Sequence, residues 1–252
     1  MELPHESRLP RFLGYHIAAL LLLGSLLLPP TDALWEQFDT WCFSMLNGSV
    51  HNRPIAQIFW ALANVKITDL YGAFFMLSFS LLYVFEKGRI VARERLAQFF
   101  YILIWGEIGI LSAKEVVYPL LKWCDQMRPS PSAVITPIVA LSKVVPWLKV
   151  KDVSHCSFPG DHALLVLQWA AFISFFAGWR YGIVAFLSSI FFILPRLIAG
   201  AHWVSDGLVG SLFLVLVILA WATCTPVYPW GMRLLQKISA KIIRAPAAHP
   251  TA

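Results

Sequence analysis

The sequence predicts an all-α membrane protein built from several spanning helices. Three observations support this class: 58% of the 252 residues are apolar, only 13% are charged, and the mean hydropathy is +0.67. An average soluble domain carries about 25% charged residues. The 20 basic and 14 acidic side chains are few to cover a soluble surface of this size. Disorder is excluded because it needs low hydrophobicity and high net charge.

Aromatic content and net charge agree with a membrane location. The chain has 11 Trp and 18 Phe, and aromatic residues anchor spans at the two membrane interfaces. The formal charge of +6 suits a protein that lies among anionic lipids. Nucleic acid is a poorer partner, because the basic residues are scattered between apolar blocks.

Six apolar stretches are interpreted as spans, since a span needs about 20 mostly apolar residues. They are residues 12–28, 70–85, 96–121, 163–178, 181–194 and 204–224. The first could be a cleaved signal peptide, but no small-x-small cleavage site follows it cleanly, so we interpret it as a retained helix. With no repeat and no second soluble domain visible, the sequence predicts a single membrane domain over residues 1–252.

Loop charge predicts the orientation of these spans. Basic residues gather in two segments. The loop after the second span has Lys87, Arg89, Arg93 and Arg95. The tail 225–252 contains no acidic residue and has Arg233, Lys237, Lys241 and Arg244. If six spans alternate, both segments lie on one side, which the positive-inside rule makes cytoplasmic. The loops 29–66, 122–162 and 196–206 then face the other side.

The last of these far-side loops holds a candidate nucleophile. His202 and Asp206 are four residues apart, which places them on one face if the chain is helical there. A carboxylate can accept a bond from one imidazole nitrogen and so leave the lone pair of the other nitrogen free to attack. Arg196 offers a planar guanidinium suited to phosphate oxygens. The simpler interpretation is an interfacial arginine, an unrelated histidine and a helix-capping aspartate.

The loop 122–162 supplies an acid and further cations. Gly160 and Asp161 precede an apolar helix, whose free N–H groups suit an anion, and His162 there can protonate a leaving oxygen. An ordinary helix cap explains the same residues. Arg128 and Lys122 are candidate phosphate ligands, or cations that snorkel from a proline-rich loop.

Together these side chains match the needs of phosphoryl transfer through a phosphohistidine: a nucleophile, a residue that orients it, an acid, and cations for the phosphate oxygens. No group of His, Cys, Asp and Glu has metal-ligand spacing, so we expect no metal or other cofactor.

The motifs resemble those of the type-2 phosphatidic acid phosphatase superfamily, whose pattern is K-x6-R-P, then P-S-G-H, then S-R-x5-H-x3-D. The chain has Arg128-Pro129, Pro159-Gly160-Asp161-His162 and Pro195-Arg196-x5-His202-x3-Asp206. Pro195 replaces the family's Ser, and Gly160 and Asp161 stand where the family has Ser and Gly. Lys122 lies six residues before Arg128 where the family spacing is seven, which turns it by about 100° on a helix.

This resemblance implies a six-helix bundle and a role for each matched residue. It makes His202 the nucleophile, Asp206 its orienting carboxylate and His162 the general acid. Arg128 and Arg196 become phosphate ligands, and no metal is implied. We also expect Lys122, Gly160 and Asp161 at the substrate.

The stretches Ser-Phe-Pro-Gly-Asp-His and Pro-Arg-x4-Ala-His-Trp-x2-Asp are most similar to the bacterial lipid A 1-diphosphate synthase branch. That branch implies transfer of the terminal phosphate of undecaprenyl pyrophosphate to the 1-phosphate of lipid A, at the periplasmic face of the inner membrane. The alternative is a lipid pyrophosphatase that gives the same phosphoryl group to water. A transporter or scramblase is disfavoured, because the polar groups gather at one face and no repeat is visible.

The sequence alone does not decide the role of two further features. Asp69 is interpreted either as a local ion pair with Lys66, three residues earlier, or as part of the site. Cys124 and Cys156 lie in far-side segments, where an oxidising periplasm would permit a disulfide.

Overall fold

The computed structural model describes residues 8–243, and these confirm the all-α class. Every regular element in this part of the chain is a helix, apart from one isolated bridge between Val65 and Val150. The elements are α1 (Arg8–Leu27), α2 (Thr31–Gly48), α3 (Pro54–Ala63), α4 (Lys66–Phe85), α5 (Gly88–Ser112), η2 (Ala113–Val117), α6 (Tyr118–Trp123), α7 (Pro131–Val134), α8 (Leu141–Val144), α9 (Asp161–Ala177), α10 (Trp179–Ala199), η3 (Asp206–Ser211), α11 (Leu212–Cys224) and α12 (Val227–Ile242).

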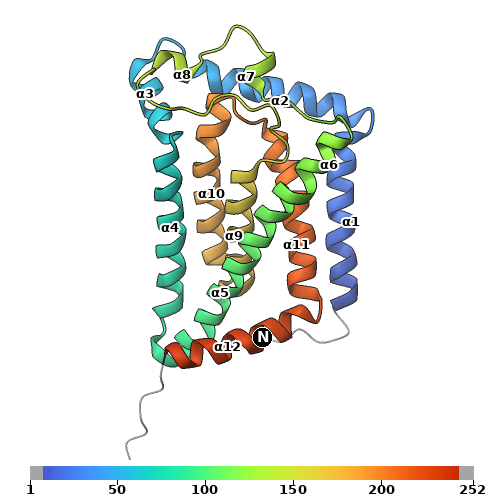
Figure 1. Ribbon diagram of the computed structural model, residues 1–252, viewed down its shortest axis with the longest axis vertical. Coiled ribbons are helices and arrows are strands. Elements are labelled where there is room, and N and C mark those ends of the chain that lie inside the picture. The colour runs from blue at the N-terminus through green and yellow to red at the C-terminus, as the bar shows by residue number, and fades with distance from the viewer. Residues whose placement is uncertain (1–7, 244–252) are drawn as a thin grey trace, which may run out of the picture.

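The long helices form a bundle, in which α1, α4, α5, α9, α10 and α11 run along the length of the molecule (Figure 1). By length and composition, five helical segments can cross a membrane: α1, α4, α5 with η2 and α6, α10, and η3 with α11. The remaining helix of the bundle, α9, is apolar but has only 17 residues. The count of six spans therefore stays a prediction.

Most of the helices extend beyond the predicted spans. Helix α1 begins at Arg8 rather than at residue 12, and α5 begins at Gly88 rather than at residue 96. Helix α4 begins at Lys66 rather than at residue 70, and α10 continues through Pro195 to Ala199. Helix α10 is followed by Gly200. The φ of +83° at this residue is left-handed, and an added Cβ would lie 2.9 Å from the Phe43 ring. Glycine is therefore required there, and Arg196 lies in the last turn of α10 rather than in a loop.

Helix α2 crosses one end of the bundle, together with α3, α7 and α8; we call this end the cap (Figure 1). The helix is amphipathic: it buries Asp39, Phe43 and Asn47, and it exposes Leu34, Phe38, Trp41 and Met45. The Asn47 amide ties it to the rest of the cap, because Nδ2 donates to the carbonyls of Val139 and Ile198, each at 3.0 Å.

Helix α12 crosses the opposite end, which we call the base (Figure 1). It packs on α5 with Tyr228, Met232 and Leu235 buried, and its cations Arg233 and Lys237 are exposed. Much of the tail 225–252 is thus an amphipathic helix along the base. Residues 244–252 of that tail lie outside the described residues.

The main core lies between α5, α9 and α11, where Trp105, Phe172 and Ile218 are buried. Helices α9 and α10 pack closely along each other. At Gly182 of α10, an added Cβ would lie 2.2 Å from Ser174 Oγ and 3.2 Å from the Ser174 Cα. This close approach depends on the absence of a side chain.

We predict that Gly182→Ala destabilises the bundle by about 1–3 kcal/mol, the usual range for overpacking a filled interior. The measurement is thermal unfolding in detergent. Gly14→Ala on α1 is the matched control, because nothing lies within 4 Å of its added Cβ. Equal melting temperatures for the two variants would contradict the close α9–α10 contact.

Candidate active site

His202 lies in the turn before η3, and its side chain is largely buried. Its Nδ1 is 2.9 Å from the carbonyl oxygen of Ser157 and 3.5 Å from Oδ2 of Asp206. A carbonyl oxygen only accepts hydrogen bonds, so Nδ1 must carry the proton. In the neutral ring the lone pair is therefore on Nε2, the nitrogen that a nucleophile needs.

Asp206 reaches His202 by a route that differs from the predicted helix face. The helical segment begins only after Trp203, so His202 and Asp206 do not share a helix. The fully buried Asp206 carboxylate instead accepts the Trp203 N–H at 2.8 Å and thereby folds the turn back on itself. The i,i+4 spacing predicted the contact correctly but not the conformation that produces it.

Arg128 lies between two buried carboxylates. Its Nη1 donates to Oδ1 of Asp206 at 3.0 Å, and its Nη2 donates to Oδ2 of Asp39 at 2.7 Å. Neither carboxylate side chain is exposed. Nη1 also donates to Ser205 Oγ at 2.7 Å, and the guanidinium lies over the Trp203 ring, 5.1 Å from its centroid. In the free protein Arg128 thus holds Asp206 in place behind His202.

Asp39 and Ser205 belong to this network, and the sequence analysis missed both. Asp39 Oδ1 accepts the Ser205 N–H at 2.9 Å, and Oδ2 accepts the Ser205 hydroxyl. The available signal was the spacing of Asp39, Phe43 and Asn47, which marks one face of α2. An amphipathic helix has polar and apolar residues on different faces, so this spacing does not show whether the polar face of α2 is buried or faces water.

Arg196 is held by residues from the α3–α4 junction. Its Nη2 donates to both carboxylate oxygens of Asp69, at 3.0 and 2.9 Å. Its Nη1 donates to the Asn64 carbonyl at 3.1 Å and to the Asn64 side-chain oxygen. Asp69 therefore joins the site, and no ion pair with Lys66 is found among the described residues.

His162 and Asp161 lie in the first turn of α9. The Asp161 carboxylate accepts the His162 N–H at 2.8 Å and approaches Nε2 of His202 to 4.0 Å. Nδ1 of His162 is 4.0 Å from Oδ1 of Asp69. The N–H of Gly160 donates to the Asp206 carbonyl at 3.3 Å, so this amide helps to join α9 to η3.

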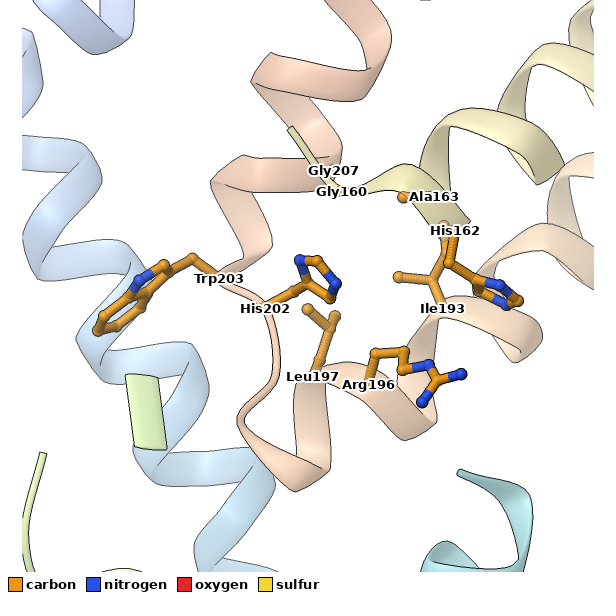
Figure 2. Close-up of a pocket in the computed structure, with 9 residues that line it drawn as sticks. All are labelled: Gly160, His162, Ala163, Ile193, Arg196, Leu197, His202, Trp203 and Gly207. Carbon is orange, nitrogen blue, oxygen red and sulfur yellow. The ribbon is translucent and has the colours of Figure 1, made fainter. Parts of the chain in front are cut away.

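His162, Arg196 and His202 share one pocket (Figure 2), which is lined by Gly160, His162, Ala163, Ile193, Arg196, Leu197, His202, Trp203 and Gly207. The His202 ring points toward the side of the pocket where His162 and Arg196 lie, whereas Trp203 points away (Figure 2). At Gly160 a Cβ would lie 3.7 Å from His202 Nδ1. Segments of the second and third motifs thus meet at a single cavity, whereas Arg128 of the first motif lies outside its lining and binds Asp206 and Asp39.

Lys122 is placed apart from this pocket. It is exposed near the end of α6, and its side chain makes no hydrogen bond or ion pair within residues 8–243. Asp125, with φ of +55°, lies between it and Arg128, so the two cations do not share a helix. Its role as a phosphate ligand stays a prediction.

The four cysteines are free thiols, so the structure contains no bond between Cys124 and Cys156. Burial raises the pKa of the Cys156 thiol, which donates to the Phe158 carbonyl at 3.3 Å. Within the described residues, no cluster of three His, Cys, Asp or Glu side chains is arranged to hold a metal ion.

Comparison with known proteins identifies the family. Residues 108–230, which include every motif residue of the pocket, match the PAP2 superfamily. The chain carries a PAP2 superfamily domain. It is also 28% identical, over 87% of its own length and 90% of the relative's, to a protein of Escherichia coli (strain K12) named lipid A 1-diphosphate synthase. No solved structure matches it. The predicted resemblance is confirmed, and the protein is an enzyme of this superfamily.

Among the described residues, Arg128 is the only arginine or lysine paired with the buried carboxylates of Asp39 and Asp206. We predict that Arg128→Gln costs about 3–5 kcal/mol, because it leaves two buried carboxylates without a counter-charge. Arg196→Gln is the control, since its partner Asp69 is 40% exposed and water can replace the lost charge. Thermal unfolding in detergent measures both losses. A loss for Arg196→Gln as large as that for Arg128→Gln would contradict this assignment.

Proposed function

We propose that the protein is a membrane phosphotransferase that moves the terminal phosphate of undecaprenyl pyrophosphate to the 1-phosphate of lipid A. The observation that carries the proposal is the His202 imidazole. Its Nδ1 donates to the Ser157 carbonyl, and its Nε2 makes no hydrogen bond among the described residues; it lies 4.0 Å from the Asp161 carboxylate, in a pocket that also contains His162 and Arg196. The similarity to lipid A 1-diphosphate synthase over most of both chains supports the choice of substrates.

In the first step, Nε2 of His202 attacks the terminal phosphorus, and the bond from that phosphorus to the bridging oxygen breaks. His162 gives its proton to this oxygen, so undecaprenyl phosphate leaves and the phosphoryl group is on His202. Asp206 stabilises the positive charge that develops on the His202 ring, and Arg196 stabilises charge on the phosphoryl oxygens.

In the second step, an oxygen of the lipid A 1-phosphate attacks the phosphohistidine. The N–P bond breaks, the new diphosphate forms, and His202 regains its lone pair. Water can take the same place as acceptor, which would make the enzyme a lipid pyrophosphatase. The two functions share the first step and differ only in the acceptor, lipid A 1-phosphate or water, that attacks the phosphohistidine.

The acceptor is tested with undecaprenyl pyrophosphate labelled in its terminal phosphate and incubated with purified protein, with and without lipid A. We expect the label on lipid A and a phosphoenzyme that is trapped when lipid A is omitted. Label that appears only as free phosphate in both reactions would establish hydrolysis instead.

The nucleophile is tested by His202→Ala, which removes the acceptor nitrogen and should abolish both trapping and transfer. His155→Ala is the matched control, because this histidine is exposed in the segment before α9 and should leave both intact. Undiminished trapping in the His202→Ala protein would move the nucleophile to another residue.

We also propose that the cap faces the periplasm and the base faces the cytoplasm of a bacterial inner membrane. Exposed cations at the base support this orientation. Helix α12 exposes Arg233, Lys237 and Lys241, and the sequence contains no Asp or Glu after Asp206. An excess of basic residues marks the cytoplasmic side of a membrane protein.

The orientation is tested in a cysteine-free background with Lys143→Cys at the cap and Lys237→Cys at the base, both at exposed positions. An impermeant thiol reagent should label the first protein and not the second in intact spheroplasts. Labelling of the Lys237→Cys protein alone would invert the orientation and separate the site from lipid A in the outer leaflet.

A further inference from the structure

Asp69 lies between two cationic groups of the pocket that come from different helices. From the first turn of α4, its carboxylate binds Arg196 of α10 at 2.9 Å and approaches Nδ1 of His162 on α9 to 4.0 Å. The Arg196 side chain is only 11% exposed and that of His162 only 22%. One carboxylate, itself 40% exposed, therefore faces two basic side chains that are more buried than it is.

Arg196 opposes the protonation of His162 that the proposed reaction requires. His162 must hold a proton to act as an acid, yet its burial and the permanent charge of Arg196 in the same pocket both disfavour a positive charge there. The other charged or titratable groups that face His162 are Asp161 on its own helix and His202 across the pocket. Asp161 is directed at the backbone N–H of His162 and at His202, so the imidazole of His162 has Asp69 as its carboxylate partner.

We propose that Asp69 is a positioning residue that favours the protonated form of His162 beside Arg196, in the way that Asp206 supports His202. This inference rests on the proposed function for the acid role of His162. Asp69 neutralises Arg196 and holds its guanidinium with two hydrogen bonds, and the same carboxylate stabilises the imidazolium form of His162. It exchanges no atoms with the substrate. The proton still passes from His162 to the leaving oxygen.

The direct test is an NMR titration of His162 in the substrate-free protein, assigned by comparison with His162→Ala. In Asp69→Asn the titration midpoint should fall by about one pH unit, because the imidazolium loses a nearby negative charge and faces an unneutralised arginine. The double variant Asp69→Asn/Arg196→Gln should return toward the wild-type midpoint, since both opposing charges are gone. Glu36→Gln, an exposed carboxylate-to-amide change on α2, should leave the midpoint unchanged.

Activity gives a second readout. The acid is active in its protonated form, so turnover is lost as the pH rises through the His162 titration. Asp69→Asn should therefore move the alkaline limb of the kcat profile to lower pH, and Asp69→Glu should restore most of that shift. A residue that only supports the fold would lower kcat at every pH and would not move the limb.

An unchanged His162 midpoint in Asp69→Asn, or a double variant that shifts as far as the single one, would overturn the proposal. The titration needs no turnover, so it remains decisive if wild-type protein fails to form a phosphoenzyme. In that case the proposed function falls, while the coupling of Asp69 to His162 is still measured on its own.

Discussion

The ion pairs of Arg128 with Asp39 and Asp206 are the interaction on which the site depends. They join the cap helix α2, the segment after α6 and the start of η3, which are distant in sequence. Because both carboxylates are fully buried, their charge must be compensated inside the protein. This requirement fixes Asp206, and through it the ring orientation of His202.

The same arrangement recurs on the other side of the pocket with a more exposed carboxylate. Arg196 is bound by Asp69 and Asn64, and the Asp69 carboxylate is 40% exposed, whereas the two carboxylates that bind Arg128 are fully buried. Both arginines are thus paired in the free protein. In the proposed reaction, Arg196 is the arginine that lines the pocket, and it is already oriented before a phosphate enters, which reduces the reorganisation needed when charge develops on the phosphate oxygens.

Short-range backbone features complete the pocket. The π-helical turn η3 begins at Asp206, and Ser211 Oγ at its end donates to the carbonyls of Gly160 and Asp206, at 2.8 and 3.1 Å. A single hydroxyl therefore connects the start of α9 to the turn that carries the orienting carboxylate. Such turns occur frequently at functional sites, because they change which side chains face inward.

The sequence alone determined the helical membrane class, the superfamily and the motif residues around the pocket, because apolar length and motif spacing are local properties. It also predicted the contact of His202 with Asp206. Only the tertiary structure decided that Asp39 pairs with Arg128 and that Asp69 pairs with Arg196 rather than Lys66. These partners lie 89 and 127 residues apart. No local periodicity records such a pairing, since it follows from where the helices pack and which carboxylates that packing buries.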